Sequence, residues 1–133
     1  MKEIVNVVGA LIIKDDKIFI TKRADGDIEA ISKYEFPGGT VEPLETNEQA
    51  LKRELMEEFS VDLSVGKVLY RVVEEYSERI IDISFYEANT DDEFVLHDDH
   101  VDFKWVSFEE LNNYQYPPVD KKFVDFLVAN YKK

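Results

Sequence analysis

The chain has 133 residues, 44% of them hydrophobic, with one Trp, seven Tyr and nine Phe. This composition suits one packed domain over residues 1–133 and excludes an intrinsically disordered chain. The absence of cysteine excludes disulfides, a thiol nucleophile and a cysteine-based zinc site. The formal net charge of −13 disfavours nucleic-acid polymers, and no apolar run reaches the ~20 residues of a membrane span. We expect a cytoplasmic monomer or homodimer that binds neither nucleic acid nor membranes.

Hydrophobic patterns predict the secondary structure in chain order. Residues 3–13 are β-branched and almost continuously apolar, which is typical of a strand buried on both faces. Asp15-Asp16 predicts a tight turn into an alternating strand at 17–23, and a short extended piece at 34–36 leads to a sharp turn at 37–39. The remaining expected elements are a helix after Thr46, strands 65–77, 79–88 and 101–106, and helices 108–114 and 119–133. A mixed sheet with helices on both faces, an α/β fold, is the simplest packing of these elements.

The helix after Thr46 carries the most informative pattern. Glu54, Glu57 and Glu58 stand at positions i, i+3 and i+4, which places three carboxylates on one helical face. The three carboxylates repel one another, and they lie in the half of the helix where the dipole disfavours anions. A divalent cation such as Mg²⁺, which prefers carboxylate oxygens, would relieve this repulsion. A solvated acidic face on an acidic protein explains the three residues equally well when they are taken alone.

Neighbouring residues extend this pattern into a longer signature. Its members are Gly39, Glu45, Arg53-Glu54-Leu55 and Glu57-Glu58, separated by five, seven and one residues. This spacing, over residues 39–61, resembles the signature of the Nudix hydrolases. Segments 9–26, 33–39 and 100–120 are similar to the MutT-like branch of that family. The resemblance implies the Nudix fold, an α/β/α sandwich with a mixed sheet.

Ser60 departs from the family pattern, which usually has Gly at this position. The residue would end the helix in the left-handed conformation, which Gly adopts without a steric penalty. We expect a local adjustment at Ser60, at a cost of about 1 kcal/mol, rather than a loss of activity.

The resemblance implies a metal site and its chemistry. Glu57 and Glu58 would bind Mg²⁺, for which Mn²⁺ could substitute, and the backbone carbonyl of Gly38 would add a ligand. Glu54 would contact the metal and orient or deprotonate the attacking water. Asp99 stands where MutT-like proteins carry another metal-binding acid. Two histidines flank it in the run LHDDHVD, so a separate transition-metal site is an alternative to a polar loop.

A second group of motif residues is expected to have a structural role. Gly39 forms part of the turn before the helix, and Glu45 is interpreted as the ion-pair partner of Arg53, which holds the loop against the helix. Glu45 as a metal ligand is the alternative. We therefore assign Arg53 to the expected catalytic residues, together with Glu54, Glu57 and Glu58.

Three residues are candidates for substrate recognition by the same resemblance. Arg23 and Phe36 match positions that face the base in MutT-like enzymes, with a surface charge and a core aromatic as the alternatives. Asp120 stands where MutT-like enzymes carry an Asn that reads oxidised guanine. An ionised Asp only accepts hydrogen bonds, which suits an exocyclic amino group and leaves the base open.

The expected function is Mg²⁺-dependent hydrolysis of a nucleoside or deoxynucleoside triphosphate to the monophosphate and pyrophosphate, a reaction suited to sanitising the nucleotide pool. A Nudix hydrolase of ADP-ribose, dinucleoside polyphosphates or another X-linked nucleoside diphosphate is the first alternative. A non-catalytic nucleotide-binding module is the second, although all three motif carboxylates are present.

Overall fold

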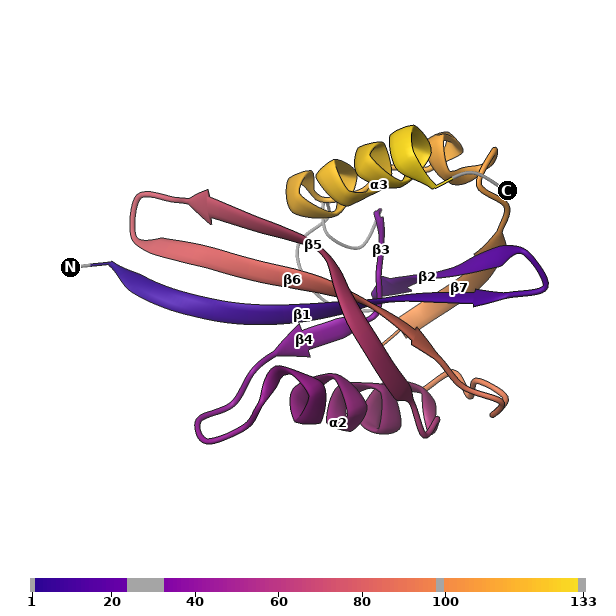
Figure 1. The fold of residues 1–133 in the computed structure, drawn as a ribbon, viewed down its shortest axis with the longest axis horizontal. Helices are drawn as coiled ribbons and strands as arrows, with labels where there is room; N and C mark the ends of the chain where they lie inside the picture. The colour runs from indigo at the N-terminus through magenta and orange to yellow at the C-terminus, as the bar shows by residue number, and fades with distance from the viewer. Residues whose placement is uncertain (1, 24–32, 98–99, 132–133) are drawn as a thin grey trace.

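A mixed β-sheet lies between two helices, α2 (Asn47–Phe59) and α3 (Pro118–Asn130) (Figure 1). The computed structural model describes residues 2–23, 33–97 and 100–131. In Figure 1, α3 covers the upper face of the sheet and α2 covers the lower face. The α/β/α sandwich expected from the sequence is confirmed.

The sheet has seven strands in the described part of the chain. Five of them lie in the order β3-β2-β1-β6-β5, while β4 pairs with β1 and β7 pairs with β2. Strands β1 and β6 run parallel, and the other pairs are antiparallel. The strand bounds are β1 Glu3–Lys14, β2 Lys17–Arg23, β3 Tyr34–Glu35, β4 Gly38–Thr40, β5 Ser64–Glu75, β6 Arg79–Asn89 and β7 His100–Val106.

Strand β1 separates two hydrophobic clusters because its successive side chains point to opposite faces. Ala10 and Ile12 pack into the cluster beneath α2, while Leu11 packs into the cluster beneath α3. All three are at most 1% exposed. The predicted burial on both faces is therefore confirmed for the middle of this strand, residues 8–12, whereas its N-terminal part is more exposed, with Ile4 60% exposed.

The segment that was expected to be only a sharp turn contains strand β4. Its backbone pairs antiparallel with β1, with Gly38 opposite Gly9 and Gly39 opposite Val8. Gly38 has a φ of +150°, and a Cβ there would lie 2.0 Å from the carbonyl oxygen of Val8. Only glycine fits this conformation and this close approach to the Val8 carbonyl oxygen. The pairing of β4 with β1 places these turn residues beside the middle of the sheet.

Helix α2 begins and ends as its sequence predicts. Thr46 is the N-cap, and its hydroxyl accepts a hydrogen bond from the Gln49 backbone N–H while the Gln49 side chain accepts one from the Thr46 N–H. Ser60 is the C-cap in the left-handed conformation, with φ 60° and ψ 37°. The short helix expected at 108–114 is instead a turn followed by a 3₁₀ helix, η1 (Leu111–Asn113), although Ser107 and Glu110 make the reciprocal hydrogen bonds of a capping box. Capping fixes the start of such a segment but does not supply the length of an α-helix.

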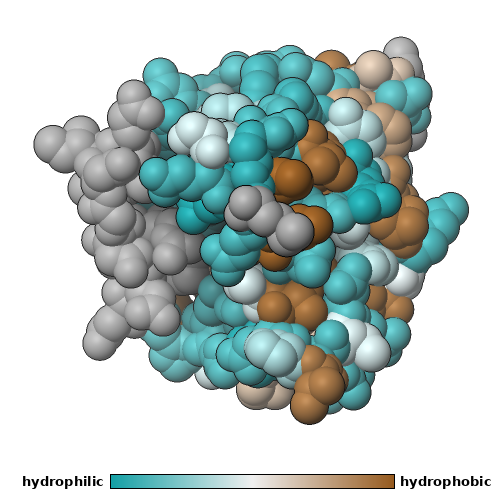
Figure 2. Space-filling view, turned by 90° about the vertical axis from the view of Figure 1, so that its left-hand side faces the viewer, coloured by the Kyte–Doolittle hydropathy of each residue, from teal (hydrophilic) through white to brown (hydrophobic). Residues whose placement is uncertain are grey.

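One end of the sheet extends beyond both helices. The N-terminal half of β1 and the β5–β6 hairpin form this end in Figure 1. Figure 2 views the molecule from this side and shows a largely hydrophilic surface with separate hydrophobic patches. No helix of the described residues is long and apolar enough to cross a membrane.

Candidate active site

Arg53 on α2 organises the acidic residues of the motif. Its Nε and Nη2 donate to the two carboxylate oxygens of Glu45 at 2.6 and 3.0 Å, and Nη2 also donates to the Thr40 carbonyl oxygen at 3.1 Å. Its Nη1 lies 3.2 Å from both Glu54 Oε2 and Glu57 Oε1. One guanidinium therefore connects the loop before the helix, the end of β4 and two carboxylates of the helix.

The Arg53–Glu45 contact is the pairing expected from the sequence, and it shifts the protonation of both groups. Hydrogen bonding from Arg53, followed by a hydrogen bond from the Glu42 backbone N–H, lowers the pKa of Glu45 to about 2. Hydrogen bonding to Glu45, chiefly, raises the pKa of Arg53 above its ordinary value. Glu45 is thus held as an anion that faces the guanidinium.

Gly39 makes room for the Glu54 carboxylate. A Cβ at Gly39 would lie 2.3 Å from Glu54 Cδ and Oε2, so any other residue would push that side chain away. Glu54 is consequently held between α2 and the backbone of β4. This contact gives Gly39 a physical role beyond the turn that the sequence suggested.

The three helix glutamates differ in exposure. The side chain of Glu54 is 16% exposed, whereas that of Glu57 is 60% exposed. Glu58 is half-buried, and its Oε1 is shielded from solvent. The three carboxylates therefore range from shielded to open along one side of the helix.

The chemistry of these donors fits an oxygen-ligated divalent cation. Carboxylates on a rigid helix are ligands that Mg²⁺ prefers, and the space cleared by Gly39 accommodates one of them. Among the described residues, no three acidic or histidine side chains converge closely enough to form a finished metal cluster. Arg53 Nη1, placed between Glu54 and Glu57, supplies the positive charge there.

Two expected site residues fall partly or wholly outside the described structure. Asp99 lies outside the described residues, so its expected role stays a prediction. Arg23 is the last residue of β2, where its backbone pairs with His100 after an irregularity in the register. The Arg23 side chain is not among the described side chains, and its contact with a base also stays a prediction.

Phe36 and Asp120 are brought together on the α3 side of the sheet. Asp120 lies in the first turn of α3, and its Oδ2 accepts a hydrogen bond from the Phe36 backbone N–H at 3.0 Å. The Phe36 ring is 5% exposed and packs against the rings of Phe85, Tyr116 and Phe123. Since the ring belongs to the core, most of its surface is already in contact with other aromatic rings.

Burial changes the titration of Asp120. The residue is 6% exposed, and desolvation raises the pKa of its carboxyl to about 7 against the opposing effect of the Phe36 N–H. Negative charge on Glu35 raises it further. Near neutral pH this side chain can therefore donate a hydrogen bond as well as accept one.

Tyr34 and Asp102 form a connection that the sequence analysis did not identify. The Tyr34 hydroxyl donates to Asp102 Oδ2 at 2.7 Å, which joins β3 and β7 across β2. Burial, followed by the hydrogen bond to this carboxylate, raises the pKa of Tyr34. Their separation of 68 residues left no local signal by which the pair could have been found.

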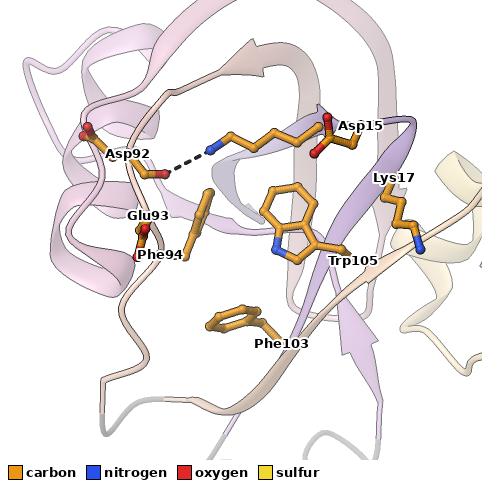
Figure 3. A pocket seen from close by; sticks show the side chains of 8 residues that line it. Asp15, Lys17, Asp92, Glu93, Phe94, Phe103 and Trp105 are labelled. Atoms are coloured by element: carbon orange, nitrogen blue, oxygen red, sulfur yellow. Dashed lines mark hydrogen bonds between the residues drawn. The ribbon is translucent and has the colours of Figure 1, made fainter.

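A pocket of about 440 Å³ opens at the other end of β2 and β7 (Figure 3). Figure 3 shows Phe94, Phe103 and Trp105 along its wall, and Lys14 also lines it. None of the residues assigned from the motif lines this pocket. It is therefore separate from the candidate active site.

Comparison with known proteins assigns the family. The NUDIX domain model matches residues 4–127. The chain is 32% identical over 127 residues to the CTP pyrophosphohydrolase of Escherichia coli (strain K12), covering 96% of this chain and 93% of that protein. It is 34% identical over 128 residues to the 8-oxo-dGTP diphosphatase of Haemophilus influenzae (strain ATCC 51907 / DSM 11121 / KW20 / Rd), again covering 96% and 93%.

A solved structure supports the same assignment. The solution structure of the Escherichia coli ORF135 protein superposes with a TM-score of 0.82 at 31% sequence identity, and the match covers 99% of this chain and 96% of that one. Sequence and fold therefore agree over nearly the whole chain. This protein belongs to the NUDIX domain family, whose hydrolases generally use a divalent metal ion.

Proposed function

We propose that residues 1–133 form one Nudix domain that hydrolyses a nucleoside or deoxynucleoside triphosphate to the monophosphate and pyrophosphate with Mg²⁺. The observation that carries the proposal is the arrangement around Arg53, which holds Glu45, Glu54 and Glu57 beside the glycine backbone of β4. The relatives named CTP pyrophosphohydrolase and 8-oxo-dGTP diphosphatase support a triphosphate as the substrate class. The acidic surface supports a free, metal-complexed nucleotide over a nucleic-acid strand, since such polymers need a basic surface.

Residues of the motif and its neighbours have proposed parts in this reaction. Glu57, Glu58, the Gly38 carbonyl and Asp99 would hold Mg²⁺ together with Glu54. When bound, the cation neutralises phosphate charge and lowers the pKa of water. Glu54, fixed against Gly39, orients the attacking water and accepts its proton. Arg53 keeps Glu54 and Glu57 in position and offsets their repulsion.

The base is proposed to bind on the α3 side of the sheet. Asp120 at the start of α3 supplies a polar group there, and Arg23, the last residue of β2, is proposed to contact the base as well. Phe36 contributes its backbone N–H, which fixes the Asp120 carboxyl, in addition to its ring. Because the pKa of Asp120 is about 7, its protonation determines whether this group offers the base an acceptor alone or also a donor.

The test is a turnover panel with Mg²⁺ in which pyrophosphate and phosphate are quantified separately. CTP and 8-oxo-dGTP come first because relatives carry those names. The other ribo- and deoxyribonucleoside triphosphates, 5-methyl-dCTP, ADP-ribose and diadenosine polyphosphates complete it. We expect pyrophosphate and a nucleoside monophosphate from one triphosphate. Turnover of only ADP-ribose or the dinucleotides would overturn the substrate class, and no turnover at all would overturn the enzyme assignment.

A further inference from the structure

The segment 90–97, between β6 and β7, is attached to the C-terminal end of α2. The Val95 N–H donates to the Phe59 carbonyl oxygen at 2.9 Å, and the Asp62 N–H donates to Asp92 Oδ2 at 2.8 Å. Phe94 stacks on Phe19 with ring centroids 4.3 Å apart. Two backbone groups near the helix end and one core ring therefore hold this segment.

Lys14 holds the same segment from the other side. Both Lys14 and Asp92 line the pocket, and the Lys14 Nζ donates to the Asp92 carbonyl oxygen at 3.0 Å. The ammonium group also lies 5.8 Å from the centroid of the Phe94 ring. All of these contacts fall on Asp92, Phe94 and Val95, in the first six residues of the segment.

The last residue of the segment, His97, is held by Ser60. Ser60 Oγ lies 2.8 Å from His97 Nε2, a hydrogen-bonding distance for either tautomer of the ring. The Ser60 backbone meanwhile ends α2, with its N–H directed to the carbonyl oxygens of Leu55 and Met56. This residue thus both ends the motif helix and fixes the chain that leads toward β7.

Serine is an unfavourable choice for the backbone at this position. With φ at 60°, Ser60 adopts a conformation that glycine populates far more readily, and glycine would keep the same backbone hydrogen bonds. The hydroxyl is the group that serine adds, and its partner in the structure is His97. The contact with His97 is therefore the physical reason we find for serine here.

We propose that Ser60 and His97 are a positioning pair that fixes the end of segment 90–97 to the C-terminal end of the motif helix. This inference rests on the proposed function, because Asp99 lies two residues after His97 in the sequence. His100, the next residue, pairs through its backbone with Arg23, another proposed site residue. Neither Ser60 nor His97 takes part in the chemistry. The pair ties the chain that precedes Asp99 to the helix that carries the proposed metal ligands Glu54, Glu57 and Glu58.

The variants that test the pair are Ser60→Gly, His97→Ala and their combination. Ser60→Gly relieves the backbone while removing the hydroxyl, so the melting temperature should stay near that of the unaltered protein. His97→Gln keeps a hydrogen-bonding group on a side chain of similar reach and should restore most of what His97→Ala loses. Ser77→Gly in the β5–β6 turn is the matched control, since it makes the same chemical change far from α2 in Figure 1.

Two readouts separate a positioning role from a merely structural one. Amide hydrogen exchange reports whether the end of segment 90–97 is still held, and the Mn²⁺ dissociation constant, measured by electron paramagnetic resonance without nucleotide, reports the metal site. Each single variant should speed exchange near residue 97 and weaken Mn²⁺ binding by about three-fold, a size set by one hydrogen bond. The double variant should be no weaker than the worse single one, because both remove the same contact.

Several results would overturn the proposal. These are unchanged exchange in Ser60→Gly, additive losses in the double variant, and faster exchange with unaltered Mn²⁺ binding. Both readouts are independent of which nucleotide is hydrolysed. Failure of the unaltered protein in the turnover panel would therefore overturn the proposed function and leave the test of the pair intact.

Discussion

Two carboxyl groups in this molecule are perturbed in opposite directions. Glu45, beside α2, faces a guanidinium, and its pKa falls to about 2. Asp120, at the start of α3, is buried beside aromatic rings, and its pKa rises to about 7. Both accept a hydrogen bond from a backbone N–H, so that contact alone does not decide the direction. A nearby cation lowers a carboxyl pKa, and burial without one raises it.

The two regions differ in what they can do as a result. On the α2 side, three carboxylates share one arginine, and Glu45 among them is held as an anion, which suits the binding of a cation and a phosphate. On the α3 side, a single carboxyl changes protonation near neutral pH, which suits recognition of a neutral base. The predictions below test this division between a charged region and a buried one.

The largest effect is expected from Glu57→Gln on the α2 side. This change removes one charge from an exposed side chain of the proposed metal site, so turnover should fall on the order of 10²-fold or more while the melting temperature is maintained. Steady-state kinetics at saturating Mg²⁺ and a thermal melt measure the two quantities. Glu48→Gln, in the exposed first turn of the same helix, is the control and should retain full turnover. Normal turnover by the Glu57 variant would remove this residue from the assignment.

Arg53→Ala should affect both turnover and stability. The change leaves Glu45, Glu54 and Glu57 without their shared cation, so we expect slower hydrolysis and a melting temperature lower by on the order of 5 °C. Calorimetry and the turnover assay check this together. Lys52→Ala, at an exposed neighbouring position of α2, is the matched control. A loss of rate with no change in melting would contradict the structural part of the Arg53 role.

Asp120→Asn tests the buried region. The folded-state pKa of about 7 lies above the ordinary value of 3.8 for an unburied Asp carboxyl, so the stability contributed by the protonated group is complete below about pH 3.8 and is lost as the pH rises through 7. Asn does not titrate, so the free energy of unfolding of the Asn variant, relative to that of the unaltered protein, should increase between pH 4 and pH 8 by up to roughly 4 kcal/mol. Urea unfolding at several pH values measures this. Parallel pH profiles for the two proteins would show that Asp120 is not perturbed as described.

The smallest effect is expected from Glu45→Gln in acid. Because the folded-state pKa is lowered to about 2, the ionised Glu45 stabilises the fold above pH 4.5, and this contribution is lost as the pH falls toward 2. The Gln variant lacks this dependence, so its stability should fall less steeply over the same interval. Thermal melts from pH 6 to pH 2 would reveal it. The opposite signs for Glu45 and Asp120 make the two variants controls for one another.

Local sequence determined most of the secondary structure because its causes are local. The Asp15-Asp16 turn has two residues with positive φ, of 52° and 64°, as the tight hairpin required. Thr46 caps α2 through contacts within four residues. The mixed sheet between two helices followed from strands and helices whose apolar patterns could be satisfied in few other ways.

The same reasoning was incomplete wherever a partner lies far along the chain. Residues 37–39 looked like a turn, yet Gly38 and Gly39 pair with β1. The sequence left the Phe36 ring open between a base-facing position and the core, and its contacts with Phe85 and Phe123 place it in the core. These outcomes depend on pairing and packing across the sheet, for which single positions carry no signal.

By itself, the sequence determined the composition of the motif and the spacing of its carboxylates, since a helix fixes which side chains share a face. Only the tertiary structure showed that Arg53, besides the expected Glu45, also meets Glu54 and Glu57, and that Asp120 is buried without a cation. Those environments are made by segments distant in sequence: β4 beside α2, and the Phe36 backbone beside α3. The electrostatic free energy of a carboxyl group depends on these surroundings, so its protonation became readable only once the chain was folded.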